Sequence, residues 1–536
     1  MPSPAGGSRK ALGVLVAVTI TATGCATRRP PPALIADLDR ARGLVEAGCY
    51  ECLAEALAAY ERVAVAHRAP QAARYGAFRA AFLLLVRSRE LGLPEAVPMA
   101  RARSLAAALP PPAEVPAGSR GLEPPLLSPD AYFAAFDLIT GEVTGYPHEE
   151  REKRSRDRSA LWPRDATQPA ARTVLTAALA ADIAADYLAL AIDCDDARAR
   201  KELKAEAALS RHDVPLMRFR LAACGLAPAQ FTALPASDAR WKETSFFLGR
   251  MEMARYPTPD VGNAAEHFQA AHDAFPDSTA ITLALANSRN SLTEYESALQ
   301  LFDSVLVVFP IHRDALLGRV MSLSYLSRYY DAIATATRMI ELGTYHMGDA
   351  YYWRAWNRYN VHQLDAAWDD AERATKLMVN TAVYTLSGYI AYARKELDIA
   401  INRFARAYQL DNTNCEAVSA EGLVHVDKEV WTAAAAKFSV AIGCFADAAQ
   451  QGRRDLALAE SADVAPAVKS RRIATAQKRI DTAEHRRAQS AFNSASAHAR
   501  AGQKAQAAAM ADIAAEHPLL KEKAIALRAA IEKLPN

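Results

Sequence analysis

Two cysteines three residues apart, Cys49 and Cys52, have the spacing in this 536-residue chain that most directly suggests chemistry. A C-x-x-C pair can exchange electrons, supply half of a metal site or form a structural disulfide. A redox pair needs a preceding strand in a βαβ unit, and no strand-like alternation flanks Cys49. A zinc site needs a second ligand pair, and Cys194 is distant in sequence. The pattern favours a structural disulfide; free thiols, redox work and metal binding are the alternatives.

The first residues indicate export. Arg9 and Lys10 precede an apolar run of about a dozen residues, which is too short to span a bilayer. Small residues then lead directly to Cys25 in the sequence "ATGC". This order resembles the lipobox of bacterial lipoproteins, although leucine is usual where Ala22 stands. Residues 1–24 are therefore predicted to be a lipoprotein signal peptide and Cys25 the lipidated residue, with an ordinary cleaved signal peptide as the alternative.

Six cysteines remain after Cys25, and an even number in an exported chain favours disulfides. Two further pairs are separated by 30 and 29 residues, about the length after which a hairpin of antiparallel helices returns to its starting end. We therefore expect each long pair to clamp the open end of a helical hairpin. The expected pairs are Cys49 with Cys52, Cys194 with Cys224, and Cys415 with Cys444.

Composition predicts a helical protein without a nucleic-acid partner. Alanine is abundant, and it has the highest helix propensity. Removing Arg9 and Lys10 with the signal peptide leaves 61 basic residues (63 minus 2) and 61 acidic residues, so no net positive charge would attract nucleic acid. Residues 453–487 are locally basic, which is typical of a solvated helix face; a contact patch for anionic lipid or glycan is the alternative.

An internal repeat organises the centre of the chain. Alanines recur with successive offsets of 34, 34, 35, 33 and 34, and a phenylalanine follows four residues after most of them. Gly388 and Gly422 precede two of these alanines by 12 residues; Ala286 and Ala355 take that place in two other units, and Val320 takes it in the weakest. The pattern resembles the tetratricopeptide repeat (TPR), a pair of antiparallel helices per unit. The resemblance implies an all-α solenoid of helical hairpins. The repeated alanines are Ala264, Ala298, Ala332, Ala367, Ala400 and Ala434.

The rest of the chain is expected to be helical hairpins joined by linkers. A Pro-rich stretch and a dense mixed-charge run indicate exposed linkers around one short helix that starts at Pro129. Near the C-terminus, Gly502 is expected to form the turn of another hairpin, and 519–533 a capping helix. The predicted divisions are 25–110 (N-terminal hairpins), 111–165 (linker), 166–235 (helical hairpin region), 236–445 (TPR array of about six repeats) and 446–536 (C-terminal and capping helices).

The resemblance also implies where a partner would bind. In this family the first helix of each unit lines a concave groove that holds a peptide or a partner helix. On that geometry, aromatic and amide side chains converge on one stretch of the groove, with Asp349 at its edge. The alternative is that the rings pack between units, as most aromatic stripes at helical spacing do. The candidate groove residues are Asn287, Asn290, Tyr352, Trp356, Tyr359, Tyr389 and Tyr392.

No catalytic motif accompanies the repeat. The chain lacks HExxH, GxSxG and P-loop patterns, so we predict no enzyme activity and no cofactor. The acidic run Asp193–Asp196 lacks the spacing of a calcium loop and is expected to cap a helix start. We therefore expect a lipid-anchored scaffold on the periplasmic side of the outer membrane, which binds an envelope protein or peptide segment. The alternative is a glycan-binding component of polysaccharide or cell-wall assembly, with the rings stacked on sugars.

Overall fold

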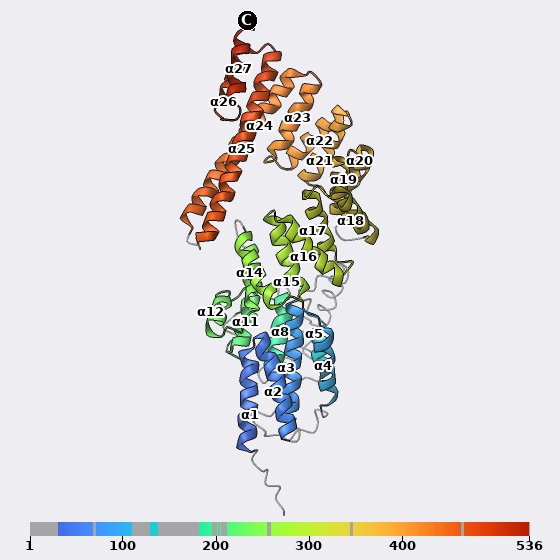
Figure 1. The fold of residues 1–536 in the computed structure, drawn as a ribbon, viewed down its shortest axis with the longest axis vertical. Helices are drawn as coiled ribbons and strands as arrows, with labels where there is room; N and C mark the ends of the chain where they lie inside the picture. The colour runs from blue at the N-terminus through green and yellow to red at the C-terminus, as the bar shows by residue number, and fades with distance from the viewer. Residues whose placement is uncertain are drawn as a thin grey trace, which may run out of the picture.

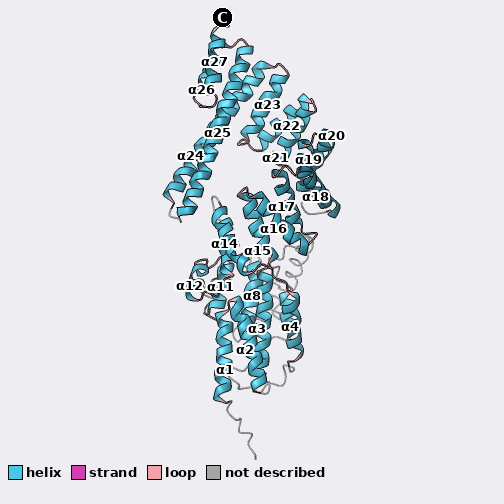
Figure 2. Ribbon diagram, in the orientation of Figure 1, coloured by secondary structure: helices cyan, strands magenta, loops and turns pink. Residues whose placement is uncertain are grey.

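The computed structural model describes residues 31–67, 71–109, 129–137, 182–195, 201, 204, 209, 212–254, 259–343, 347–462 and 466–534. Every regular element in these residues is a helix (Figures 1 and 2). The predicted all-α solenoid of TPR-like helical hairpins is confirmed. The predicted signal peptide, Cys25 and, apart from 129–137, the predicted linker 111–165 lie outside the described residues.

The chain is elongated, with a non-repeating helical module at its N-terminal end and a curved array of helix pairs leading to the C-terminus (Figure 1). The N-terminal module is held together by one large apolar cluster over its first helices and a second around Phe219 and Trp241. Its helices in the described residues are α1 (Pro32–Ala47), α2 (Tyr50–Ala66), α3 (Gln71–Glu90), α4 (Ala96–Ala107), α5 (Pro129–Phe136), α8 (Ile183–Asp195), α11 (Pro215–Ala223) and α12 (Gln230–Ser237).

Six helix pairs form the array, and sequential helices pack against each other throughout. We call the first helix of each pair the A helix and the second the B helix. The pairs are α13 (Thr244–Met253) with α14 (Val261–Ala274), α15 (Thr279–Ser291) with α16 (Tyr295–Val308), α17 (Arg313–Tyr325) with α18 (Tyr329–Leu342), α19 (Met347–Asn360) with α20 (Leu364–Leu377), α21 (Thr381–Ala393) with α22 (Leu397–Leu410), and α23 (Cys415–Asp427) with α24 (Trp431–Ser461).

The turn between A and B helices repeats in the backbone as well as in sequence. Five non-glycine residues have positive φ, and each lies five residues before a repeated alanine. Their spacings of 34, 35, 33 and 34 equal those of the alanines that follow them, because a left-handed residue follows each A helix from α15 to α23. These residues are Thr293, Ser327, His362, Lys395 and Glu429.

Close packing explains the small residue of each A helix. A Cβ added to Gly388 or Gly422 would lie 2.7 or 2.8 Å from the ring of the phenylalanine in its own pair. The α17–α18 pair reverses these sizes, because Val320 is buried in the same cluster as Ala336, which stands where four of the six pairs have phenylalanine. The unit that looks weakest in sequence therefore conserves volume by exchanging a large and a small side chain.

The six cysteines join in the three expected pairs, with Cα–Cα distances of 4.8, 5.3 and 5.5 Å in chain order. Cys49 and Cys52 lie at the N-terminus of α2 with both side chains fully buried, so solvent thiols have no access to them. Cys415 begins α23 and is joined to Cys444 in α24, across the open end of that hairpin.

The second disulfide joins the ends of two helices of the module. Cys194 lies in the last turn of α8, and Cys224 follows the last residue of α11. The acidic run begins in the last turn of α8, and its last residue, Asp196, lies outside the described residues, as do most of residues 196–211. The expected hairpin clamp and the expected helix cap therefore stay predictions.

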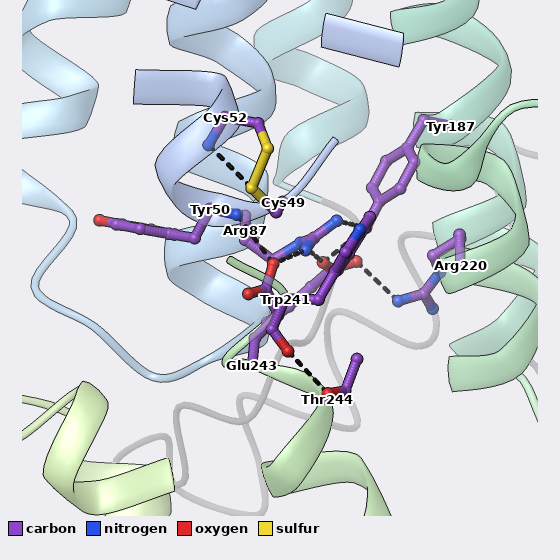
Figure 3. A network of polar contacts seen from close by, with 10 residues as sticks. Cys49, Tyr50, Cys52, Arg87, Tyr187, Arg220, Trp241, Glu243 and Thr244 are labelled. Atoms are coloured by element: carbon purple, nitrogen blue, oxygen red, sulfur yellow. Dashed lines mark hydrogen bonds and ion pairs between the residues drawn. A yellow bond between two sulfur atoms is a disulfide. The ribbon is translucent and has the colours of Figure 1, made fainter. Parts of the chain in front are cut away.

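A fully buried polar network joins the helices of the N-terminal module (Figure 3). Arg87 of α3 donates to Glu243 at 2.6 Å and to Glu90 at 3.0 Å, and its guanidinium lies 3.8 Å from the centre of the Phe219 ring. Arg220 donates to the other oxygen of Glu90 at 2.6 Å. Two arginines thus balance two glutamates, which is what makes charge at this depth tolerable.

The network extends to the first disulfide and to the array. The backbone N–H of Tyr50, between the two cysteines, donates to Glu243 at 2.8 Å (Figure 3). Farther on, Ser278 donates to the backbone carbonyl of Leu91, and the N–H of Thr279 donates to Gly92 at 3.2 Å. The turn that ends α3 therefore fixes the start of α15 against the N-terminal module.

The last helix of the array, α24, is longer than the B helices of the other pairs. The array was expected to end at 445, but α24 runs to Ser461 and the next helix, α25 (Pro466–Arg500), has 35 residues. The expected turn at Gly502, with φ of 74°, leads to α26 (Lys504–Ala515), and α27 (Lys521–Glu532) lies within the predicted capping segment. By length and composition α24 could cross a membrane, but it packs against both α23 and α25.

Candidate functional site

The candidate site is the A-helix surface at the centre of the array, which we call the wall. It comprises the candidate groove residues: Asn287 and Asn290 on α15, Tyr352, Trp356 and Tyr359 on α19, and Tyr389 and Tyr392 on α21. The helices that carry it start with side-chain caps: Asn380 accepts the N–H of Val383, and Ser278 that of Ile281. The same 34-residue rhythm that builds the pairs thus places these side chains on successive helices.

The three α19 rings are neither sealed in the core nor free on the surface. Tyr352, Trp356 and Tyr359 are half-buried and pack beside a cluster that includes Ala355 and Leu386, whereas Tyr351 of the same helix is buried at 8% exposure. Both of the alternatives drawn from the sequence therefore hold in part. One side of each ring packs between units, and the remaining surface is exposed.

The two α21 tyrosines reach toward the next A helix. The Tyr389 hydroxyl donates to Glu416 at 3.3 Å, and the Tyr392 hydroxyl donates to Asp427 at 2.8 Å. Burial, together with the hydrogen bond to Asp427, raises the pKa of Tyr392 to about 12, and burial with Glu416 raises that of Tyr389 further. Burial likewise raises the pKa of Tyr352 to about 12. All three phenols therefore remain neutral hydrogen-bonding groups at physiological pH.

The asparagines of α15 differ from each other. Asn287 is exposed and offers its amide to solvent. Asn290 is half-buried and accepts a hydrogen bond from Ser322 of α17 at 3.2 Å. A similar bond from the buried Asn357 of α19 to Ser324 of α17 measures 2.8 Å. Only Asn287 therefore has the exposure of a backbone-binding amide; Asn290 also serves to join two A helices.

A second group of rings adjoins the wall and was missed from sequence. Tyr325, 51% exposed at the end of α17, stacks on Tyr295 with ring centres 4.7 Å apart and planes within 14°. Trp353 meets Tyr325 and Tyr352 edge-on, at 5.8 and 5.3 Å. The wall residues stand three residues before, or one or four residues after, the small residue of their A helix. Tyr325 stands five residues after Val320, one position beyond that pattern, and for this reason the sequence pattern did not include it.

The rings that adjoin the wall do not lie in one plane. Tyr295 and Tyr325 cover each other's faces, and the two pairs made by Trp353 have interplanar angles of 72° and 78°. This second group therefore presents ring edges beside the wall rather than a flat, open aromatic platform.

Other features of the described residues do not define a site. They contain no group of three or more His, Cys, Asp or Glu that could hold a metal ion. A groove of about 1230 Å³ lies where α23, α24 and α25 meet. Its lining includes basic side chains such as Lys478 and Arg486 but also Asp447, Asp455 and Glu416, and this mixture of charges selects no ligand of one sign.

The solved structures that resemble this chain have low sequence identity and low TM-scores. No family model and no curated protein matches the chain. Among solved structures, YrrB, described as a TPR protein with an unusual peptide-binding site, is 23% identical, covers 34% of this chain and 93% of its own, and has a TM-score of 0.28. The thermophilic TPR protein TTC0263 of Thermus thermophilus is 14% identical, covers 34% and 99%, and scores 0.30. A TPR protein of Parabacteroides merdae is 14% identical, covers 48% and 96%, and scores 0.36.

The fold and the wall define the class of protein without appeal to those scores. Helices of the described residues recur as antiparallel pairs at a 34-residue spacing, with one face of the A helices carrying aromatic and amide groups. This is an all-α solenoid of TPR-like helical hairpins.

Proposed function

We propose that this protein is a non-catalytic scaffold that binds a segment of another protein along the wall. The observation that carries the proposal is the state of the aromatic side chains: five rings from α19 and α21 are held by packing beneath them and keep part of their surface exposed. Rings fixed in this way lose little conformational entropy on binding, and tyrosine and tryptophan are the usual anchors of protein recognition.

The partner's chemistry follows from the wall. Aromatic faces suit apolar or proline side chains, and the exposed Asn287 amide can pair with an extended backbone. The hydroxyls of Tyr389 and Tyr392 donate to Glu416 and Asp427. These carboxylates also lie 3.9 Å from Arg486 and Lys395, so the charges at this edge are already paired. A segment with apolar anchors therefore fits best.

We place the scaffold in the cell envelope, tethered by a lipid on Cys25 and facing the periplasm from the outer membrane. The lipobox-like sequence supports the tether. Three disulfides among the described residues support an oxidising compartment, since cytosolic thiols stay reduced. Labelling of cells with radioactive palmitate tests the tether: the wild-type chain should take up label, and the Cys25→Ser variant should not. Unlabelled wild type would contradict it.

Site-directed photo-crosslinking tests the wall. A photoreactive amino acid at exposed Asn287 should give a discrete protein adduct in cells, and the same group at exposed Ser304, on the B helix α16, should not. Trp356→Ala with Tyr389→Ala should abolish the adduct while circular dichroism remains helical. Equal adducts from both positions, or an adduct that survives the loss of both rings, would overturn binding at the wall.

A further inference from the structure

The helices after the array contain an insertion. Gly502 occupies the left-handed turn of the last helix pair, as Glu429 does in α23–α24, and Ala507 follows Gly502 by five residues as in the five pairs from α15–α16 to α23–α24. The distance from 429 to 502 is 73 residues, which is 39 more than the usual 34. We call residues 446–484 the arm: it consists of the extension of α24 and the first half of α25, without 463–465, which are not described.

The arm returns across the array to its first pair. Figure 1 shows α24 and α25 running from the C-terminal end toward α14. Arg472 of the arm contacts Asp260 at 2.5 Å, and Arg471 contacts Glu266 at 2.8 Å. Asp260 is the N-cap of α14 and is only 6% exposed, whereas the Arg472 side chain is 28% exposed, so solvent ions can still reach one side of the pair. We call these four residues the latch.

A glycine allows the close approach. A Cβ on Gly262, in the first turn of α14, would lie 2.6 Å from Nε of Arg471. None of the apolar clusters in the described part of the chain includes side chains from both α14 and α25. The contact is therefore made by charge rather than by buried apolar surface. Such a contact weakens with salt and can open and close without unfolding either helix.

The part of α25 that directly follows the arm lies on the A-helix side of the array. Ser490 of α25 contacts Ser419 of α23 at 3.4 Å, and Arg486 lies 3.9 Å from Glu416, the acceptor of the Tyr389 hydroxyl. Each helix from α14 to α25 contacts the next, and α25 contacts α14 again. The contacts thus close into a ring that includes the helices carrying the wall.

We propose that the arm is a strap that closes the array into a ring through the latch, and that opening the latch gives a partner lateral access to the wall. With the latch closed, only a segment with a free end can thread into the ring; with it open, an internal loop can enter from the side. The consequence for a partner rests on the proposed function, but the closure itself does not.

Pulsed electron paramagnetic resonance on the full chain tests the closure without a partner. Nitroxides carried on non-cysteine amino acids at exposed Ala270 of α14 and Ala474 of the arm leave the disulfides intact. The wild type should give one narrow, short distance distribution. Arg471→Glu with Arg472→Glu should shift most of it to a broad distribution at longer distances, because both contacts become repulsive.

Two further variants make the result specific. Arg471→Glu with Glu266→Arg restores opposite charges and should recover the short distance. Arg454→Glu with Lys478→Glu makes the same change of charge at the base of the arm, beside α23, and should leave the distribution unchanged. A charge-reversed latch that keeps the short distance, a swap that fails to recover it, or a wild type without it would overturn the strap. These outcomes are independent of the crosslinking at the wall, so failure of one proposal is distinguishable from failure of the other.

Discussion

The N-terminal module and the repeat array hold their helices together by different means. In the module, α3, α8 and α11 and the residues just before α13 are joined by a buried network in which Arg87 alone contacts Glu90, Tyr187 and Glu243. In the array, most pairs place a small residue of one helix against a phenylalanine of the other, as at Gly422 and Phe438. The array has a buried charged pair as well, Arg354 with Asp370 at 2.7 Å.

The difference teaches how register is specified. In the array, the same packing interface recurs between successive helix pairs, so the repeat itself specifies how one helix is aligned with the next. In the module no interface recurs, because its helices differ in length and spacing. A network of directional hydrogen bonds then selects one arrangement, since a shifted helix would leave buried charges without partners.

The largest expected effect is in the module. Arg87→Met removes one partner from a fully buried set and leaves Glu243 without its cation, so we expect a loss of about 3–5 kcal/mol in the free energy of unfolding. Denaturant unfolding followed by tryptophan fluorescence measures it, because Trp241 lies beside the network (Figure 3). Arg218→Met, which removes an exposed pair with Asp213, should cost no more than about 1 kcal/mol. Equal costs would show that the network does not set the module's register.

An intermediate effect is expected in the array. Gly388→Val places two methyl groups against the Phe404 ring, and overpacking of this kind costs about 1–3 kcal/mol. Thermal unfolding by circular dichroism should show a lower midpoint. Gly443→Ala, at a helical glycine with no atom within 4 Å of the added Cβ, should instead stabilise by up to about 1 kcal/mol. If both substitutions had the same sign, close approach would not explain the small residue.

The smallest effect is expected at the turns. Glu429 has φ of 58°, and a residue with a Cβ pays roughly 1–2 kcal/mol there, partly offset by the greater freedom of glycine when unfolded. Glu429→Gly should therefore stabilise by less than about 1 kcal/mol, measured as a shift in the denaturation midpoint. The neighbouring Val430→Gly, at φ of −92°, should destabilise. A destabilised Glu429→Gly would mean that contacts of the glutamate, and not the turn conformation, hold this position.

Much of the array could be predicted from the sequence, because the same packing requirement places similar residues at the same position of each successive helix pair. The alanine spacing predicted the pairs α15–α16 to α23–α24, and Gly502 predicted a turn. The candidate wall was located by the same register. The exposed fraction of its side chains could not be predicted, because it depends on how much of Tyr352 and Trp356 is buried between neighbouring helix pairs.

The sequence by itself determined the helical class, the repeat period and the candidate partners of the six cysteines, since each depends on local spacing along the chain. Only the tertiary structure decided that Cys49 and Cys52 are sealed from solvent, that Glu243 lies beside Arg87 from 156 residues away, and that α25 returns to α14. These features are contacts between helices that are far apart in the sequence. Side-chain packing and charge pairing determine such contacts, and the sequence repeat carries no information about them.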